Sequence, residues 1–181
     1  VAARGGTTLG EVQAIPHEGR ALNAMIVGAV KVAAELYEQG AIKGVVSIGG
    51  SMGTTLGSSV MRALPFGFPK VMISTMASRN TRAFVGTRDI LMLHSVCDLA
   101  GLNRMTRKIL ANGAGALAGM VNSGSMESGY ETPRRQIALS TLGTTEACAA
   151  WLRQVLSEEG FEVVTFHTNG SGGQAMEEMI T

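Results

Sequence analysis

Short apolar runs alternate along the chain with stretches in which apolar residues recur at helical spacing. In the first two thirds of the sequence, three such runs predict buried strands at residues 45–48, 71–74 and 90–96, although the last run also fits a helix. Apolar spacing predicts three helices: residues 20–39, the stretch that follows Gly50 and ends before Pro65, and residues 98–121 with Asp98 as N-cap. Residues 1–19 and 79–88 lack periodicity, and we expect loops there.

A polar stretch rich in Gly and Ser interrupts this pattern at residues 123–134 and predicts a linker. The pattern then restarts, with strands expected at residues 137–142 and 161–167 and helices at residues 146–159 and 174–180. The predicted fold class is α/β: a Rossmann-like, three-layer parallel sheet in residues 1–122, followed in residues 135–181 by the beginning of a second Rossmann-like subdomain. Two strands are too few for an independent unit, so we expect the chain to be a piece of a longer protein.

Composition narrows the classes of function. Hydrophobic residues make up 45% of the chain and charged residues 16%, which is typical of a well-buried globular protein. The net charge of +1 and the lack of a basic patch with aromatic residues argue against binding to nucleic acid or membranes. No apolar run approaches the roughly 20 residues of a membrane span. Cys97 and Cys148 lack metal-ligand spacing, and we expect free thiols in a reducing cytoplasm and no metal site.

The stretch between the first predicted strand and its helix has the composition of an anion site. It holds six candidate ligand-binding residues: Gly49, Gly50, Ser51, Gly53, Thr54 and Thr55. Glycines let the backbone approach a ligand, and the first N–H groups of the following helix point outward unpaired. Hydroxyl groups add donors, so we expect a phosphate here. The same composition also suits a turn that only caps a helix, and that interpretation stays open.

Other predicted strands end in similar residues. Ser74 and Thr75 lie at the end of the second strand, and the carboxyl ends of parallel strands meet at one edge of a sheet. The candidates in the second subdomain are Gly143, Thr144, Gly170, Ser171, Gly172 and Gly173. Because no lysine follows these glycine turns, phosphates would lie against N–H groups and hydroxyls without a Walker P-loop. Residues 113–118 match G-x-G-x-x-A, but they lie inside a predicted helix, where small residues favour close packing.

A serine hydrolase is the alternative enzymatic interpretation. The first glycine turn fits G-x-S-x-G, the nucleophile elbow, in the strand–turn–helix context that this motif needs. Ser51, then Asp89 or Asp98, then His167 gives the chain order of an α/β-hydrolase triad. No second oxyanion motif of the HGGG type accompanies it, and His94, within an apolar run, suits a core position.

Several longer runs together resemble one known family. They are Gly49-Gly50-Ser51-Met52-Gly53-Thr54, Met61-Arg62-Ala63-Leu64-Pro65, Pro69-Lys70-Val71-Met72-Ile73-Ser74-Thr75-Met76-Ala77-Ser78, Asp98-Leu99-Ala100-Gly101-Leu102-Asn103-Arg104, and Ala111-Asn112 with Ala118-Gly119-Met120-Val121. These runs are similar to those of the Tm-one-like ATP-binding family, which includes a tomato virus-resistance protein and bacterial and fungal relatives. The similarity covers about residues 19–181.

The resemblance implies an N-terminal region of two Rossmann-like subdomains that binds ATP, with Mg²⁺ able to accompany the nucleotide. It also implies a TIM-barrel-like domain further along the longer chain, and a first strand with a glycine turn ahead of the residues present here. Asn103, Arg104 and His167 are expected as polar partners of the nucleotide, although Arg104 also suits an exposed helix charge. A non-enzymatic partner-binding module and a homodimer stay open, as does the question of whether the protein is an enzyme.

Overall fold

The structure, a computed structural model, describes residues 1–123, 134–168 and 170–180. The chain divides into two units, Val1–Met126 and Glu127–Thr181, and each is described by itself. Both units combine parallel strands with helices, which confirms the predicted α/β class.

Three parallel strands form the sheet of the first unit, in the order β1 (Val45–Gly49), β2 (Lys70–Ser74) and β3 (Leu91–His94). All five residues of β2 are buried, because it is the central strand and helices cover both faces of the sheet. Gly49, Ser74 and His94 lie opposite one another in register, so the carboxyl ends of the three strands are level. The three predicted strands are therefore confirmed, the last as a strand and not a helix.

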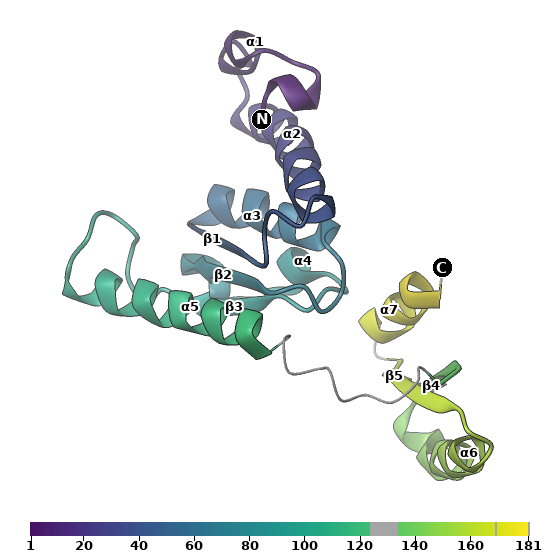
Figure 1. Cartoon of the computed structure of the whole chain (residues 1–181). Coiled ribbons are helices and arrows are strands. Elements are labelled where there is room, and N and C mark those ends of the chain that lie inside the picture. The colour runs from purple at the N-terminus through teal and green to yellow at the C-terminus, as the bar shows by residue number, and fades with distance from the viewer. Residues whose placement is uncertain (124–133, 169, 181) are drawn as a thin grey trace. The chain divides into compact units, whose positions relative to one another are not determined.

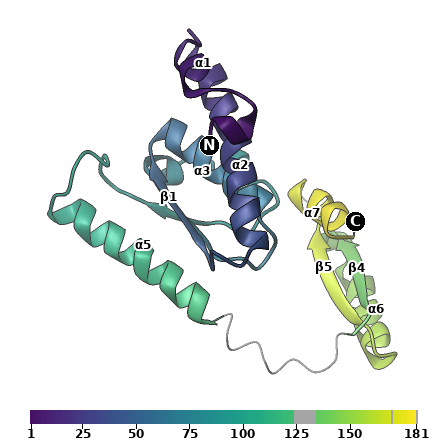
Figure 2. The ribbon, with the colours of Figure 1, turned by 45° about the horizontal axis from the view of Figure 1, so that its top comes forward.

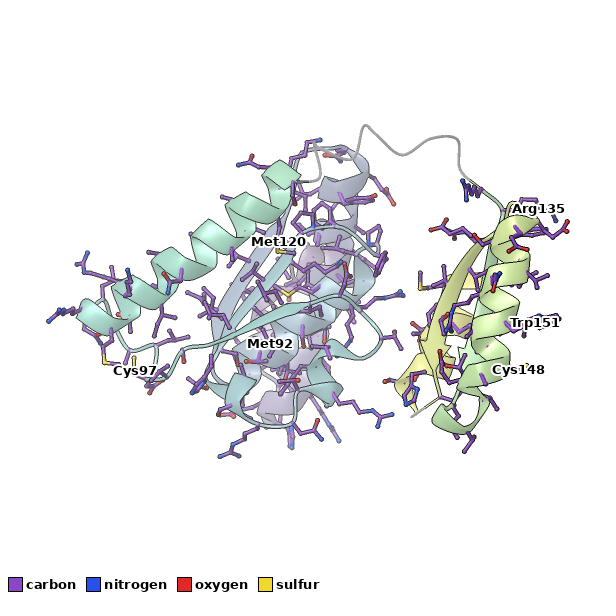
Figure 3. All side chains as sticks on the ribbon, turned by 90° about the horizontal axis from the view of Figure 1, so that it is seen from below. Met92, Cys97, Met120, Arg135, Cys148 and Trp151 are labelled. Carbon is purple, nitrogen blue, oxygen red and sulfur yellow. The ribbon has the colours of Figure 1, made fainter. Side chains whose placement is uncertain are left out.

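Helices α3 (Ser51–Ala63) and α5 (Arg104–Ser123) cover opposite faces of this sheet, as Figures 1 and 2 show, and α2 (Glu18–Glu38) packs against α3. Gly113 lets α5 approach the sheet, since a Cβ at this position would clash with the side chain of Ile73. In Figure 3, Met120 lies on the side of α5 that faces the sheet. Of the small residues at 113–118, Gly113 serves this packing, as predicted, whereas Gly115 is exposed and a Cβ there would meet nothing within 4 Å.

The loop expected over residues 1–19 is wrong in part. A 3-10 helix, η1 (Ala3–Gly5), and α1 (Leu9–Gln13) lie there against α2. Thr8 and Glu11 form a capping box that starts α1. Gly28 of α2 lets the N-terminal segment come close, because a Cβ there would clash with the carbonyl group of Val1.

The loop expected over residues 79–88 contains a short helix, α4 (Arg82–Val85). The guanidinium group of Arg62 on α3 holds this helix, because its Nη1 donates to the carbonyl oxygens of Ala83 and Phe84, both at 2.9 Å. The fold here depends on a contact between residues distant in sequence.

The start of α5 also corrects the sequence prediction, because the helix begins at Arg104 and Asp98 does not cap it. Oδ1 of Asn103 accepts from the N–H groups of Met105 at 2.9 Å and Thr106 at 3.0 Å. Oγ1 of Thr106 accepts in return from the N–H of Asn103 at 2.8 Å. These reciprocal bonds satisfy the free N–H groups of the first turn, and they place the N-cap at Asn103.

The second unit has two parallel strands and two helices with a 3-10 turn: β4 (Gln136–Thr141), η4 (Gly143–Thr145), α6 (Glu146–Glu158), β5 (Glu162–His167) and α7 (Ser171–Ile180). Both strands confirm their predictions to within about one residue. Helix α7 begins earlier than expected, so Gly172 and Gly173 are helical. Gly172 lets the first turn of α7 lie close to the end of β5, since a Cβ there would clash with the carbonyl group of His167. Trp151 of α6 points away from the strands and is 61% exposed (Figure 3).

Candidate functional site

The turn from β1 into α3 leaves helix N–H groups facing solvent. Gly50 is the N-cap, with no side-chain cap, and its carbonyl accepts the first helical bond from the N–H of Thr54 at 2.8 Å. The N–H groups of Ser51, Met52 and Gly53 therefore precede the first helical bond, and Gly50, Ser51 and Met52 are exposed. The first turn of α3 carries no acidic residue, so the positive end of its dipole is not neutralised there.

The glycines around this turn have different structural reasons. A Cβ at Gly49 would lie 2.8 Å from Cα of Gly53, and one at Gly53 would lie 3.2 Å from the carbonyl oxygen of Ile48. A Cβ at Gly57 would lie 2.5 Å from Cβ of Ser47. These three glycines therefore allow α3 to pack tightly on β1.

Gly50 is the exception in this turn. The nearest atom to a Cβ at Gly50 would be Oγ1 of Thr75, at 3.7 Å, which is an ordinary contact distance. Its backbone is extended, with a φ of −81° and a ψ of −152°, and lies outside the left-handed region that favours glycine. Neither packing nor a left-handed backbone requires glycine at this position, and a Cβ there would point toward the Thr75 hydroxyl.

Two of the candidate hydroxyls are buried under the turn. Thr54 and Ser74 are both 0% exposed, and their side-chain oxygens lie 2.6 Å apart. Oγ1 of Thr54 donates to the carbonyl oxygen of Gly50 at 2.6 Å, and that of Thr55 donates to Ser51 at 2.9 Å. These three side chains hold the turn from within, whereas Ser51 is exposed.

The end of β3 adds residues that the sequence analysis did not select. His94 is half-buried, and its Nδ1 lies 3.4 Å from the carbonyl oxygen of Ser74. Ser95 is 0% exposed, and its N–H donates to the same carbonyl at 3.1 Å. Val96 has a φ of +62°. Ser95 lies inside the strand predicted over residues 90–96, so it was not recognised as a strand-end serine like Ser74, and nothing in the sequence indicated the backbone of Val96.

Asn103 and Arg104 lie at the start of α5. The amide oxygen of Asn103 serves as the helix cap, and Arg104 is an exposed first residue of the helix. A cation at a helix N-terminus opposes the dipole, so its position favours a nearby anion. A role for either residue in nucleotide binding stays a prediction.

In the second unit, the turn that precedes α6 is less suited to an anion than the turn that precedes α7. Gly143 and Thr144 lie in η4, next to a helix whose first turn carries Glu146, paired with Arg153. A carboxylate there neutralises the positive end of the α6 dipole. The first turn of α7, which begins at Ser171, carries no acidic residue.

Around α7, His167 is exposed at the end of β5. Gly170, with a φ of +107°, makes the turn into the helix, and a Cβ on Gly173 would meet nothing within 4 Å. Binding by Gly170, Ser171, Gly172 and Gly173 stays a prediction.

The structure gives the hydrolase interpretation no support. A nucleophile elbow is a strained turn, but Ser51 is the first residue of α3, and Val96 is the one non-glycine residue with positive φ in the described part of the chain. Asp89 is engaged elsewhere, because its Oδ1 lies 2.7 Å from Nζ of Lys70 and its Oδ2 accepts from the N–H of Gly67. Asp98 is exposed, and its Oδ1 accepts from the N–H of Leu99 at 2.9 Å.

An apolar groove of about 540 Å³ lies between β1 and α5. Val46 and Ile48, at 51% and 53% exposed, form its side on β1, and Leu117 and Val121 form its side on α5. Its apolar lining does not suit a phosphate group.

Among residues 1–123, 134–168 and 170–180, no group of three or more His, Cys, Asp or Glu side chains is placed to hold a metal ion. Over the same ranges, no helix has the length and apolar character needed to cross a membrane.

Parallel strands, helices on both sheet faces and a glycine turn at the carboxyl ends of the strands define a Rossmann-like α/β domain. The chain belongs to the family described as Uncharacterised protein family (UPF0261). The N-terminal domain of that family matches residues 1–126, and its C-terminal domain matches residues 134–181.

Curated relatives support the same family. The chain is 40% identical over 180 residues to a UPF0261 protein of Clostridium tetani, an alignment that covers 99% of this chain and 44% of the relative. It is 40% identical over 143 residues to the ToMV resistance protein Tm-1(GCR237) of Solanum lycopersicum, which covers 77% of this chain and 19% of the relative. The resemblance inferred from the residues is thereby confirmed. The chain spans less than half the length of these relatives.

Proposed function

We propose that the first unit binds the phosphate groups of ATP at the turn from β1 into α3, without a Walker P-loop. The observation that carries this proposal is Gly50, a glycine that neither packing nor a left-handed backbone requires, at the mouth of an uncapped helix. A side chain there would occupy the space through which a phosphate reaches the N–H groups of Ser51, Met52 and Gly53.

The chemistry of the turn suits an anion of this size. Three backbone N–H groups and the end of the α3 dipole supply positive potential, and the hydroxyls of Ser51 and Thr75 add donors beside them. The resemblance to an ATP-binding family supports ATP as the nucleotide. Mg²⁺ would enter with the phosphates, since such sites hold the ion largely through phosphate oxygens and water.

Gly50→Ala tests this proposal by adding one methyl group at the mouth of the turn. We expect isothermal titration to show ATP affinity about tenfold lower than in the unmodified chain. The melting temperature should stay unchanged, because the methyl group meets its nearest neighbour at an ordinary distance.

Gly119→Ala is the matched control, since Gly119 is exposed on α5 and its added Cβ meets nothing within 4 Å. It should bind ATP like the unmodified chain. Equal affinity in the Gly50→Ala and Gly119→Ala variants would contradict a phosphate site at Gly50.

A further inference from the structure

A directed chain of hydrogen bonds runs beneath the β1–α3 turn. The N–H of Met76 donates to Oγ of Ser74 at 2.9 Å, and that oxygen lies 2.6 Å from Oγ1 of Thr54. Oγ1 of Thr54 in turn donates to the carbonyl oxygen of Gly50 at 2.6 Å. A hydroxyl has one proton, so Thr54 must accept from Ser74. The chain therefore points in one direction and ends on the carbonyl of Gly50.

The main chain of Ser74 extends this network to β3. Its carbonyl oxygen accepts from the N–H of Ser95 at 3.1 Å. Oγ of Ser95 donates to the carbonyl oxygen of Cys97 at 2.8 Å, and the N–H of Cys97 returns to the carbonyl oxygen of Ser95 at 2.6 Å. Ser95 thus clamps a three-residue turn, and Figure 3 shows Cys97 on the segment between β3 and α5.

The clamped turn is strained. Val96, its central residue, has a φ of +62°, a conformation that is costly for a β-branched side chain. Val96 is also 66% exposed, so little packing of its side chain offsets this cost. The hydrogen bonds of the fully buried Ser95 are the interactions that hold the turn.

We propose that Ser95 is a positioning residue for the phosphate site, an inference that rests on the proposed function above. The carbonyl of Gly50 and the N–H of Ser51 belong to one planar trans peptide group and point in opposite directions. The hydrogen bond from Thr54 fixes that carbonyl group, and it therefore directs the N–H of Ser51 toward the ligand. The clamp at Ser95 keeps Ser74 and Thr54 in the arrangement that does so.

ATP titrations of the 181-residue chain test this inference. Ser95→Ala removes the clamp, and we expect affinity to fall about fivefold. Adding Val96→Gly in the same chain should restore affinity to within about twofold, since glycine holds a positive φ without the clamp. Affinity is measured well below the melting temperature of each variant, where a merely structural role of Ser95 would leave it unchanged. Ser59→Ala is the control, because the Ser59 hydroxyl bonds to Thr55 within α3, outside the network.

If Ser95→Ala does not fold, Val96→Pro replaces it, because proline fixes a negative φ at an exposed position. Val96→Pro should also weaken ATP binding about fivefold. Normal binding by either variant, or failure of Val96→Gly to rescue Ser95→Ala, overturns the role of Ser95 and leaves the phosphate site standing. No binding by the unmodified chain overturns both proposals.

Discussion

The four glycines around the β1–α3 turn differ in what surrounds them, and this difference shows which of them serve packing. A Cβ at Gly49 or Gly57 would meet its neighbours at 2.8 or 2.5 Å, which the fold does not allow, and one at Gly53 would lie tightly against the carbonyl oxygen of Ile48 at 3.2 Å. A Cβ at Gly50 would meet only Oγ1 of Thr75, at an ordinary contact distance of 3.7 Å. The sequence presents all four as one glycine-rich run, and only their three-dimensional neighbours distinguish the glycine that suits a ligand.

Lys70 is a second residue whose role depends on its neighbours. It is 0% exposed, and its Nζ donates to Asp89 at 2.7 Å, to the carbonyl of Pro65 at 2.7 Å and to that of Phe68 at 2.9 Å. All three protons of the ammonium group are thus used, which allows a charge to lie at the start of the central strand.

We predict that Lys70→Met lowers the free energy of unfolding by about 3 kcal/mol, because it leaves Oδ1 of Asp89 without its cation and two carbonyl groups without their donor. Urea unfolding measures this loss. Arg153→Met removes the more exposed ion pair with Glu146 in the second unit and should cost less than about 1 kcal/mol. Similar losses for the two variants would show that the burial of Lys70 is energetically unimportant.

At the scale of elements, the predictable parts are those with a sequence pattern of their own. The strands and α2, α3 and α6 follow from apolar runs and helical spacing. The predicted start of α5 is wrong because Asp98 and Asn103 are both good N-cap residues. Asn103 is the cap in the structure, where its side chain accepts from the N–H of Thr106 and its own N–H donates to the Thr106 hydroxyl. Helix α4 was missed because a distant arginine holds it.

Helix α1 was missed although the sequence carries its signal. Thr8 and Glu11 have the spacing of a capping box, and Oε2 of Glu11 accepts from the N–H of Thr8 at 2.7 Å. This bond, with those from the hydroxyls of Thr7 and Thr8, holds the pKa of the Glu11 carboxyl below its usual value. The helix has five residues, too few for a periodic pattern.

The lowered pKa of Glu11 predicts how α1 responds to acid. A carboxyl whose pKa is lower in the folded chain stabilises it above the ordinary glutamate pKa of about 4.3, and this stabilisation is lost as the pH falls through the lowered value. Amide exchange measured by NMR from about pH 6 to about pH 3 should show α1 opening before α2. Glu11→Gln should remove this pH dependence, and an unchanged profile in that variant would exclude Glu11 as its source.

At the scale of the whole molecule, the two units match the two domains of one family. The long matched runs made the family recognisable from the sequence, and the α/β class followed from alternating strands and helices. The candidate site was predictable as a region, the ends of the parallel strands. The individual roles of Gly50, Ser95 and Val96 were not, because they depend on neighbours and backbone angles that no local pattern records.

Thermal unfolding in the presence of AMP, ADP and ATP, each with and without Mg²⁺, shows whether this chain binds the phosphates of a nucleotide. A ligand at 100 times its Kd stabilises the folded state by about 2.7 kcal/mol, which raises the melting temperature clearly. We expect a rise that increases with the number of phosphates and is smaller in Gly50→Ala. Unchanged melting with all three nucleotides at millimolar concentration would contradict it.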